Sequence, residues 1–125
     1  MGKLIFFVDD DKMIINLLEY TLKNRMDYEM KTFFSGEECL SNLSMKPDLI
    51  VLDHNFTSGG EGGLSGMETL MEIKKINKLL PVIILTGMED ENLKYEYISE
   101  GAARYIRKND FFIDTLMESI VKELT

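Results

Sequence analysis

Short apolar runs alternate five times with segments of helical periodicity along this 125-residue chain, and this order constrains the fold more than any other feature. The expected strands cover residues 3–8, 28–34, 48–53, 82–86 and 103–108. The expected helices cover residues 11–25, 35–45, 66–77, 89–101 and 110–125. Strands that alternate with helices favour a parallel sheet joined by right-handed crossovers. We therefore expect one α/β domain over residues 1–125, with five strands and five helices.

The apolar content of the strands predicts their order in the sheet. The first, third and fourth strands are almost entirely apolar, which is typical of central strands covered on both faces. The second and fifth strands mix polar and apolar residues, which suits the edges of a sheet. The predicted order is 2-1-3-4-5, that of a flavodoxin-like doubly wound sheet. Such a sheet binds its ligand at the carboxyl ends of strands 1 and 3, where the order reverses.

The first helix illustrates how side chains are assigned to the core. Apolar residues that recur every three or four positions lie on one face of a helix. In segment 11–25 the residues with this spacing are Ile14, Leu17, Leu18 and Leu22. We expect these four side chains to face the sheet.

Charged and hydroxyl side chains lie at the carboxyl ends of four of the predicted strands. These residues are Asp9, Asp10, Asp53, Thr86 and Lys108. Three crowded carboxylates remain ionised only if cations lie among them. Lys108 is one candidate cation, and Mg²⁺, which prefers carboxylate, carbonyl and water oxygens, is the other. A carboxylate in this setting can attack phosphorus, so Asp53 is predicted to form an aspartyl phosphate.

Each of these residues also has a structural explanation. Aspartates that precede a helix interact favourably with its positive end, and Asp11 is expected to be an N-cap. Thr86 could be a turn hydroxyl, and Lys108 could be a surface lysine. Suitable groups at all four strand ends are an improbable coincidence, however, so the combination favours a functional site.

Charge and cysteine content restrict the possible partners. The formal net charge is −8, which argues against direct contact with a nucleic-acid backbone. No apolar run is long enough to span a bilayer, and the N-terminus has no pattern of a secretory signal. The single cysteine, Cys39, cannot form an internal disulfide and is expected to be a semi-buried helical thiol. We expect a cytoplasmic protein without membrane contact.

Over the whole chain, "VDDD", "LIVLD", "VIILTG" and "GAARYIRK", in this order, resemble the motifs of the receiver domain of two-component response regulators. The positions that the resemblance assigns to Mg²⁺ are Asp9, Asp10, Asp53 and the backbone carbonyl of Asn55. The positions that it assigns to phosphoryl transfer and switching are Asp53 as phosphoacceptor, Thr86, Lys108, and Tyr105 as the aromatic switch residue.

The resemblance implies a phosphorylation switch, not an enzyme. A histidine kinase or phosphotransfer protein would phosphorylate Asp53 in a Mg²⁺-dependent reaction. The surface formed by helix 89–101, strand 103–108 and helix 110–125 would then change its preference for a downstream protein target. The same surface leaves room for a homodimer. If these 125 residues are the whole protein, output is expected through partner binding or phosphoryl relay; if they are a fragment, the output lies outside this sequence.

The sequence departs from the family pattern in several places. Asn109 replaces the proline that usually follows the lysine, and a trans peptide or a strained one is expected because a cis bond before a non-proline residue costs about 2.5–4 kcal/mol. The loop over 57–66 is long and rich in glycine, and is interpreted as a tolerated insertion or as a lid over the site. Gly87 replaces the usual alanine. His54 is expected to point away from the site as a bystander.

Three alternatives remain open. "DHNFT" nearly matches the D-x-D-x-T motif of haloacid-dehalogenase-like phosphatases, but Asn55 replaces their second aspartate. A flavodoxin-like cofactor module would need a phosphate-binding loop where "DDDKM" stands. A degenerate receiver that serves only as a docking module would lose its phosphoacceptor role.

Overall fold

A computed structural model describes residues 3–25, 27–54 and 63–125 of the chain. Its strands are β1 (Leu4–Val8), β2 (Glu29–Phe33), β3 (Leu49–Asp53), β4 (Val82–Thr86) and β5 (Arg104–Arg107). Its helices are α1 (Lys12–Arg25), α2 (Gly36–Ser41), the short 3-10 helix η1 (Leu43–Met45), α3 (Gly66–Ile76), α4 (Glu91–Ser99) and α5 (Phe112–Leu124).

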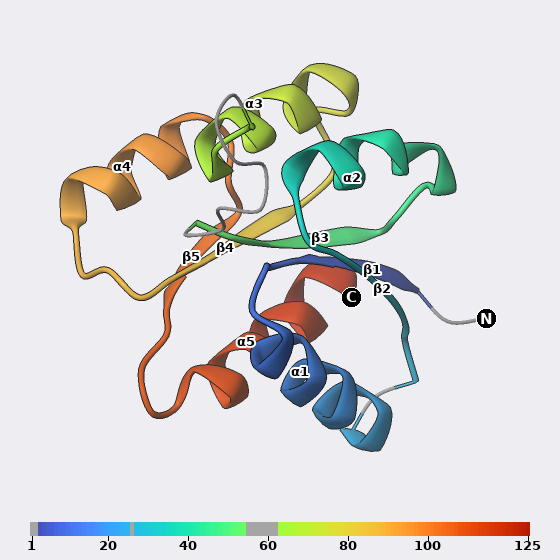
Figure 1. Cartoon of the computed structure of the whole chain (residues 1–125). Coiled ribbons are helices and arrows are strands. Elements are labelled where there is room, and N and C mark those ends of the chain that lie inside the picture. Colours follow the sequence, from blue (N-terminus) through green and yellow to red (C-terminus); the bar gives the residue numbers. More distant parts are fainter. Residues whose placement is uncertain (1–2, 26, 55–62) are drawn as a thin grey trace.

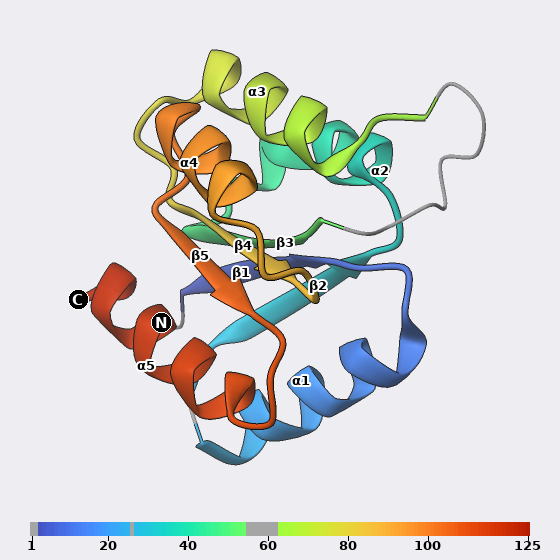
Figure 2. The ribbon, with the colours of Figure 1, turned by 90° about the vertical axis from the view of Figure 1, so that its left-hand side faces the viewer.

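The strands form one parallel sheet in the order β2-β1-β3-β4-β5, which confirms the predicted flavodoxin-like topology. Helices α2, α3 and α4 cover one face of the sheet, and α1 and α5 cover the other (Figure 1, Figure 2). None of the described helices is both long and apolar enough to cross a membrane.

Two apolar cores fill the spaces between the sheet and its helices. Alternate residues of each central strand point to opposite faces. In β1, Phe6 packs toward α2, α3 and α4, whereas Ile5 and Phe7 pack toward α1 and α5. All residues of β3 and β4 are buried, as expected for strands covered on both sides.

The core-facing stripe of helix α1 differs from the prediction. Ile15, Leu18 and Leu22 are buried, whereas 45% of Leu17 is exposed and Ile14 is only partly buried. Ile15, Leu18 and Leu22 are spaced by three and four positions, so they share a face as readily as the predicted set. The spacing alone could not choose between these two neighbouring stripes.

The predicted helix over 35–45 is divided in two. Helix α2 ends at Ser41, where the Asn42 side chain donates a hydrogen bond to the Glu38 carbonyl (2.7 Å). The 3-10 turn η1 follows and ends at Lys46, which has a left-handed φ of 57°. Asparagine competes with the backbone for such hydrogen bonds, which explains the early end of α2.

Capping residues fix where several helices begin. Ser35 is the N-cap of α2, and its side chain accepts a hydrogen bond from the Glu38 N–H. Ser65 and Glu68 form a capping box at the start of α3. Asp11 accepts from the Met13 N–H at the start of α1, as its expected capping role requires. At the other end of α4, Gly101 adopts a φ of +107°, which permits the chain to leave the helix toward β5.

Charged side chains line both edges of the sheet. In β2, Glu29 and Lys31 are exposed and alternate with less exposed residues. In β5, Arg104 forms an ion pair with Glu123 of α5 (2.8 Å), and Arg107 forms one with Glu89 (3.0 Å). The mixed polarity that predicted these two strands as edges therefore reflects solvent-facing charges.

Candidate functional site

An acidic cluster lies at the carboxyl ends of β1 and β3. Asp9 and Asp10 directly follow β1, and Asp53 is the last residue of β3, its neighbour in the sheet. Each of the three offers a carboxylate oxygen, and these oxygens lie within 4.8 Å of one another. Only 2% of Asp9 and 3% of Asp53 are exposed, so their charges cannot be screened well by water.

Lys108 provides a positive charge for this cluster. Its Nζ lies 2.9 Å from Asp53 Oδ1 and 3.4 Å from Asp9 Oδ2. The Lys108 N–H donates to the Thr86 carbonyl (2.7 Å), which fixes the lysine beside the end of β4. No peptide bond is cis in the described ranges, so the bond to Asn109 is trans, as predicted.

The electrostatics show that one lysine does not balance the cluster. Burial and the nearby Asp53 charge raise the pKa of Asp9 from 3.8 to about 6, although the Asp11 N–H and Lys108 partly oppose this rise. Burial lowers the pKa of Lys108, but contact with Asp53 and the charge of Asp9 outweigh it and leave that pKa raised. The cluster therefore favours additional positive charge.

The donor set fits a divalent cation. Asp53 Oδ1 is fully buried and, apart from its ion pair with Lys108, accepts no well-aligned hydrogen bond from the described residues. Such a buried oxygen lacks the partners that a carboxylate normally requires. With three carboxylates converging on one point, the arrangement suits Mg²⁺.

Thr86 lies beside the cluster at the end of β4. It is fully buried, and its Oγ1 accepts a hydrogen bond from the Met88 N–H (3.1 Å). In the sheet register Leu85, its preceding residue, is the partner of Asp53. The hydroxyl therefore belongs to the same edge of the sheet as the acidic cluster.

Tyr105 lies on β5, on the surface that β5 shares with α4. Its hydroxyl donates a hydrogen bond to the Met88 carbonyl (3.3 Å), and its ring is partly exposed. Tyr105 thus contacts the loop that follows Thr86. Asn55, the fourth predicted metal ligand, and most of the glycine-rich loop over 57–66 lie outside the described residues.

Sequence reasoning did not anticipate one contact next to Asp53. His54 Nδ1 is hydrogen-bonded to the hydroxyl of Tyr97 in helix α4. His54 does point away from the acidic cluster, as expected, but it has a specific partner. Tyr97 was not singled out, although Leu93 and Tyr97 are spaced as one helical face in an otherwise polar helix.

Comparisons with known proteins show the family of this chain. The family model described as the response regulator receiver domain matches residues 5–121. The alkaline phosphatase synthesis transcriptional regulatory protein PhoP of Bacillus subtilis is 35% identical over 109 residues. That match covers 86% of this chain but 43% of PhoP, so the chain spans less than half of that relative.

Solved structures show the same fold. The response regulator DrrB of Thermotoga maritima, an OmpR/PhoB homolog, has a TM-score of 0.84 and 28% identity, covering 99% of this chain and 53% of DrrB. A CheY-like receiver domain protein from Methanospirillum hungatei has a TM-score of 0.85 and 24% identity, covering 99% of this chain and 94% of its own. From the fold, the placement of the acidic cluster and the family match, we conclude that the chain belongs to the response regulator receiver domain family.

Proposed function

We propose that Asp53 accepts a phosphoryl group from a histidine kinase or phosphotransfer protein in a Mg²⁺-dependent reaction. One observation carries this proposal: a buried carboxylate oxygen of Asp53 has Lys108 beside it and no well-aligned hydrogen bond from the described residues. A carboxylate that is held in place but poorly hydrogen-bonded keeps a lone pair available as a nucleophile.

The proposed reaction transfers the phosphoryl group from nitrogen to oxygen. An Asp53 oxygen forms a bond to phosphorus while the bond from phosphorus to the donor imidazole breaks, and that imidazole then takes up a proton. Lys108 would stay beside the incoming phosphoryl oxygens, and the Thr86 hydroxyl would donate to one of them. Such transfer depends mainly on positioning and on neutralising charge. The chain is thus a phosphoacceptor and not a catalyst of repeated turnover.

The proposed metal ligands are Asp9, Asp10, Asp53 and the backbone carbonyl of Asn55. When bound, Mg²⁺ would supply the positive charge that the cluster and the phosphoryl oxygens require. The two residues after β1 and the one ending β3 approach from neighbouring strands, which brings one carboxylate oxygen of each within 4.8 Å of the others.

The proposed output surface is formed by α4, β5 and α5. Phosphorylation would change how this surface binds a downstream protein target, with Tyr105 as the switch residue, and the same surface would support any homodimer. A cavity of about 200 Å³ opens there, lined by residues that include Met88, Lys94 and Tyr105. We propose a cytoplasmic setting and no direct nucleic-acid contact by these 125 residues, whose net charge is −8.

Acetyl phosphate and intact-mass analysis test this function. In the presence of Mg²⁺ the protein should gain one phosphoryl group, and a chelator should prevent the gain. Asp53→Asn should gain none, whereas Asp27→Asn, which changes an exposed aspartate before β2, should behave like the unmodified protein. A stable adduct on a serine or threonine would contradict the assignment, and no uptake at all would leave the protein-docking role as the better explanation.

A further inference from the structure

Helix α4 is attached to the rest of the molecule mainly by one side chain. Within its nine residues, all of which the structure describes, Tyr97 is the buried one. Leu93 is partly buried against the same core, and the remaining residues are exposed. Tyr97 itself is fully buried and among the largest buried side chains of the described ranges. The position of α4 on the sheet therefore depends on how Tyr97 is held.

The Tyr97 hydroxyl is held at the end of strand β3. It is hydrogen-bonded to His54 Nδ1, and the two rings meet edge-on with centroids 5.4 Å apart. It also approaches the start of α3 so closely that a Cβ added to Gly66 would lie 2.7 Å from it. Burial is the main reason that the pKa of Tyr97 is raised, so its hydroxyl keeps its proton and is available to donate to His54 Nδ1.

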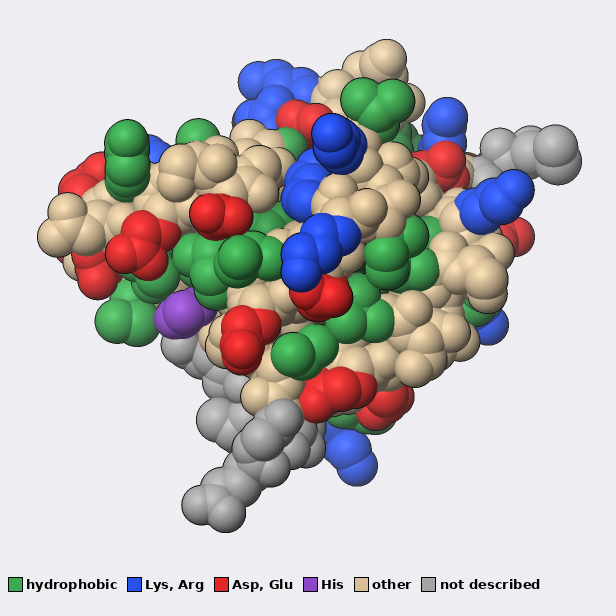
Figure 3. All heavy atoms as spheres, turned by 90° about the horizontal axis from the view of Figure 1, so that it is seen from above, with side chains coloured by type: hydrophobic (Ala, Val, Ile, Leu, Met, Phe, Trp, Pro, Cys, Tyr) green, Lys and Arg blue, Asp and Glu red, His purple; other side chains and the backbone are tan. Residues whose placement is uncertain are grey.

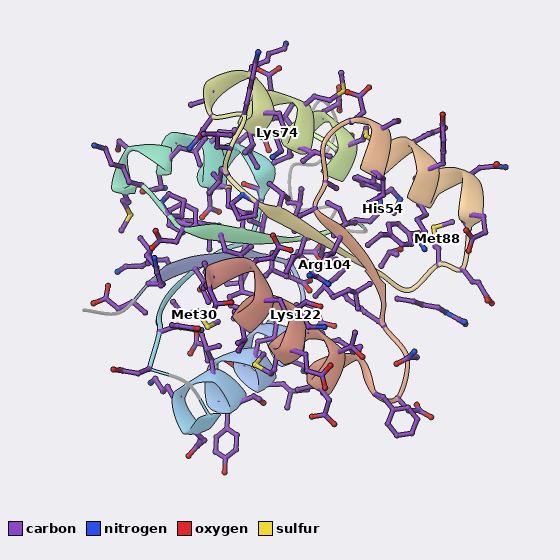
Figure 4. All side chains as sticks on the ribbon, turned by 180° about the vertical axis from the view of Figure 1, so that it is seen from behind. Met30, His54, Lys74, Met88, Arg104 and Lys122 are labelled. Carbon is purple, nitrogen blue, oxygen red and sulfur yellow. The ribbon has the colours of Figure 1, made fainter. Side chains whose placement is uncertain are left out.

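His54 is in turn fixed to the phosphoacceptor strand. It follows Asp53 directly, and its N–H donates to the Leu85 carbonyl (2.8 Å), which extends the pairing of β3 with β4. Because side chains alternate along a strand, His54 points to the α4 side of the sheet. Figure 4 shows His54 beneath helix α4, and Figure 3 shows that the imidazole of this single histidine reaches the surface.

The other side of Tyr97 faces the output surface. The centroid of its ring lies 6.1 Å from that of Tyr105 on β5, with the two planes tilted by 42°. A path of direct contacts therefore leads from the residue next to Asp53, through one hydrogen bond and one buried ring, to the β5 side chain whose hydroxyl contacts Met88.

We propose that the hydrogen bond between His54 and Tyr97 positions helix α4 on the phosphoacceptor strand and carries the state of Asp53 to the surface formed by α4 and β5. The inference rests on the proposed phosphoacceptor function and adds the route by which phosphorylation of Asp53 changes the surface formed by α4 and β5. His54 and Tyr97 are positioning residues, since neither is expected to touch the phosphoryl group. The hydrogen bond couples Asp53 to the surface formed by α4 and β5 only if removing it changes how that surface responds to the state of Asp53, and not stability alone.

The first measurement tests the link without any phosphorylation. Because the chain has one histidine, its imidazole nitrogen signals in NMR spectra are unambiguous. We expect the neutral ring to carry its proton on Nε2, with a Nδ1 signal that shifts in Tyr97→Phe. Tyr95→Phe, which removes an exposed hydroxyl two residues away on the same helix, should leave that signal unchanged. A neutral ring protonated on Nδ1, or a signal indifferent to Tyr97→Phe, would overturn the proposal.

The second measurement tests coupling. Beryllofluoride with Mg²⁺ serves as the phosphoryl mimic, and amide shifts are followed at two places, around Asp53 and along α4. In Tyr97→Phe and His54→Ala, the shifts around Asp53 should persist while those along α4 fall at least twofold. His54→Asn, which places an acceptor oxygen near the position of Nδ1, should restore part of the response along α4. Tyr95→Phe should respond like the unmodified protein.

The outcomes separate the link from the function on which it rests. If the unmodified protein shows no shift around Asp53, the proposed phosphoacceptor function fails, and with it the relay, whatever the imidazole spectrum shows. If it responds and Tyr97→Phe gives the full response along α4, the relay alone is refuted. If both sets of shifts disappear in Tyr97→Phe while its amide spectrum remains that of a folded protein, Tyr97 acts on binding at Asp53 and the proposed relay is also refuted.

Discussion

At the scale of single residues, the candidate site is dominated by negative charge that is buried and incompletely balanced. Asp9 and Asp53 are almost inaccessible to water, and Lys108 contacts both. Such an arrangement costs stability in the absence of a cation, because desolvation and mutual repulsion both oppose ionisation. The cluster therefore favours the binding of any ligand that brings positive charge.

Replacing Asp9 with asparagine should stabilise the metal-free protein. The pKa of Asp9 is raised from 3.8 to about 6 on folding, so the folded state binds this proton more tightly than the unfolded state. The stabilisation that this bound proton gives the folded state is present below pH 4 and is lost as the pH rises through about 6. In chelator at pH 7, Asp9→Asn should gain on the order of 1–2 kcal/mol in the free energy of unfolding.

Urea denaturation between pH 4 and pH 7 measures this effect. Stability of the unmodified protein and of the control Asp27→Asn should fall across that range relative to Asp9→Asn. Added Mg²⁺ at pH 7 should stabilise the unmodified protein by mass action and Asp9→Asn much less. Parallel pH profiles for all three proteins would show that Asp9 does not carry the strain of the cluster.

At the scale of elements, helices α2 and α3 pack closely against each other near their N-terminal ends. Gly36 begins α2 and lies against α3, where a Cβ would be 2.0 Å from Thr69 Oγ1. Thr69 is fully buried, and its hydroxyl donates to the Ser65 carbonyl (2.7 Å), so it cannot move aside easily. This contact sets how closely α2 and α3 approach each other above the sheet.

Gly36→Ala should therefore destabilise the protein by about 1–3 kcal/mol, because a methyl group is forced into filled space. Gly87→Ala is the matched control, since a Cβ there would meet nothing within 4 Å. Its effect should stay within about 0.5 kcal/mol. Thermal denaturation of the two variants gives the comparison, and equal melting temperatures would mean that α2 and α3 can separate at little cost.

The sequence predicted the elements better than it predicted their contacts. Strand order followed from which strands were almost entirely apolar, and the four charged residues around the site, Asp9, Asp10, Asp53 and Lys108, followed from the strand ends. The side of α1 that faces the core did not follow, because Leu17 and Ile15 are equally apolar and lie on opposite sides of Leu18 and Leu22, which both possible stripes share. The hydrogen bond between His54 and Tyr97 joins residues 43 positions apart, and no local pattern encodes such a distance.

At the scale of the whole molecule, the sheet separates the two apolar cores. Cys39 lies in the core under α2, α3 and α4, and none of its surface is exposed, so the semi-buried thiol expected from the sequence is fully buried. Burial raises the pKa of its thiol to about 12. A thiol this buried reacts only when the surrounding structure opens, because the thiolate is the reactive form.

The reactivity of Cys39 should therefore report opening of this core. At pH 8 without denaturant, a disulfide reagent such as dithionitrobenzoate should react at least a hundredfold more slowly than with the unfolded chain. The rate should rise with urea in step with global unfolding measured by circular dichroism. Rapid labelling of the folded protein would indicate that α2 opens independently of the rest of the fold.

The charged edges of the sheet oppose self-association of the protein through its edge strands. An open sheet exposes unpaired backbone groups at both ends, and such strands can recruit other chains into growing assemblies. The edge strand β2 carries the exposed charges of Glu29 and Lys31. The other edge strand, β5, carries Arg104 and Arg107, which form ion pairs with Glu123 and Glu89. These charges oppose polymerisation of the native protein, and the buried, mainly apolar strands β3 and β4 favour aggregation only when the chain is partly unfolded.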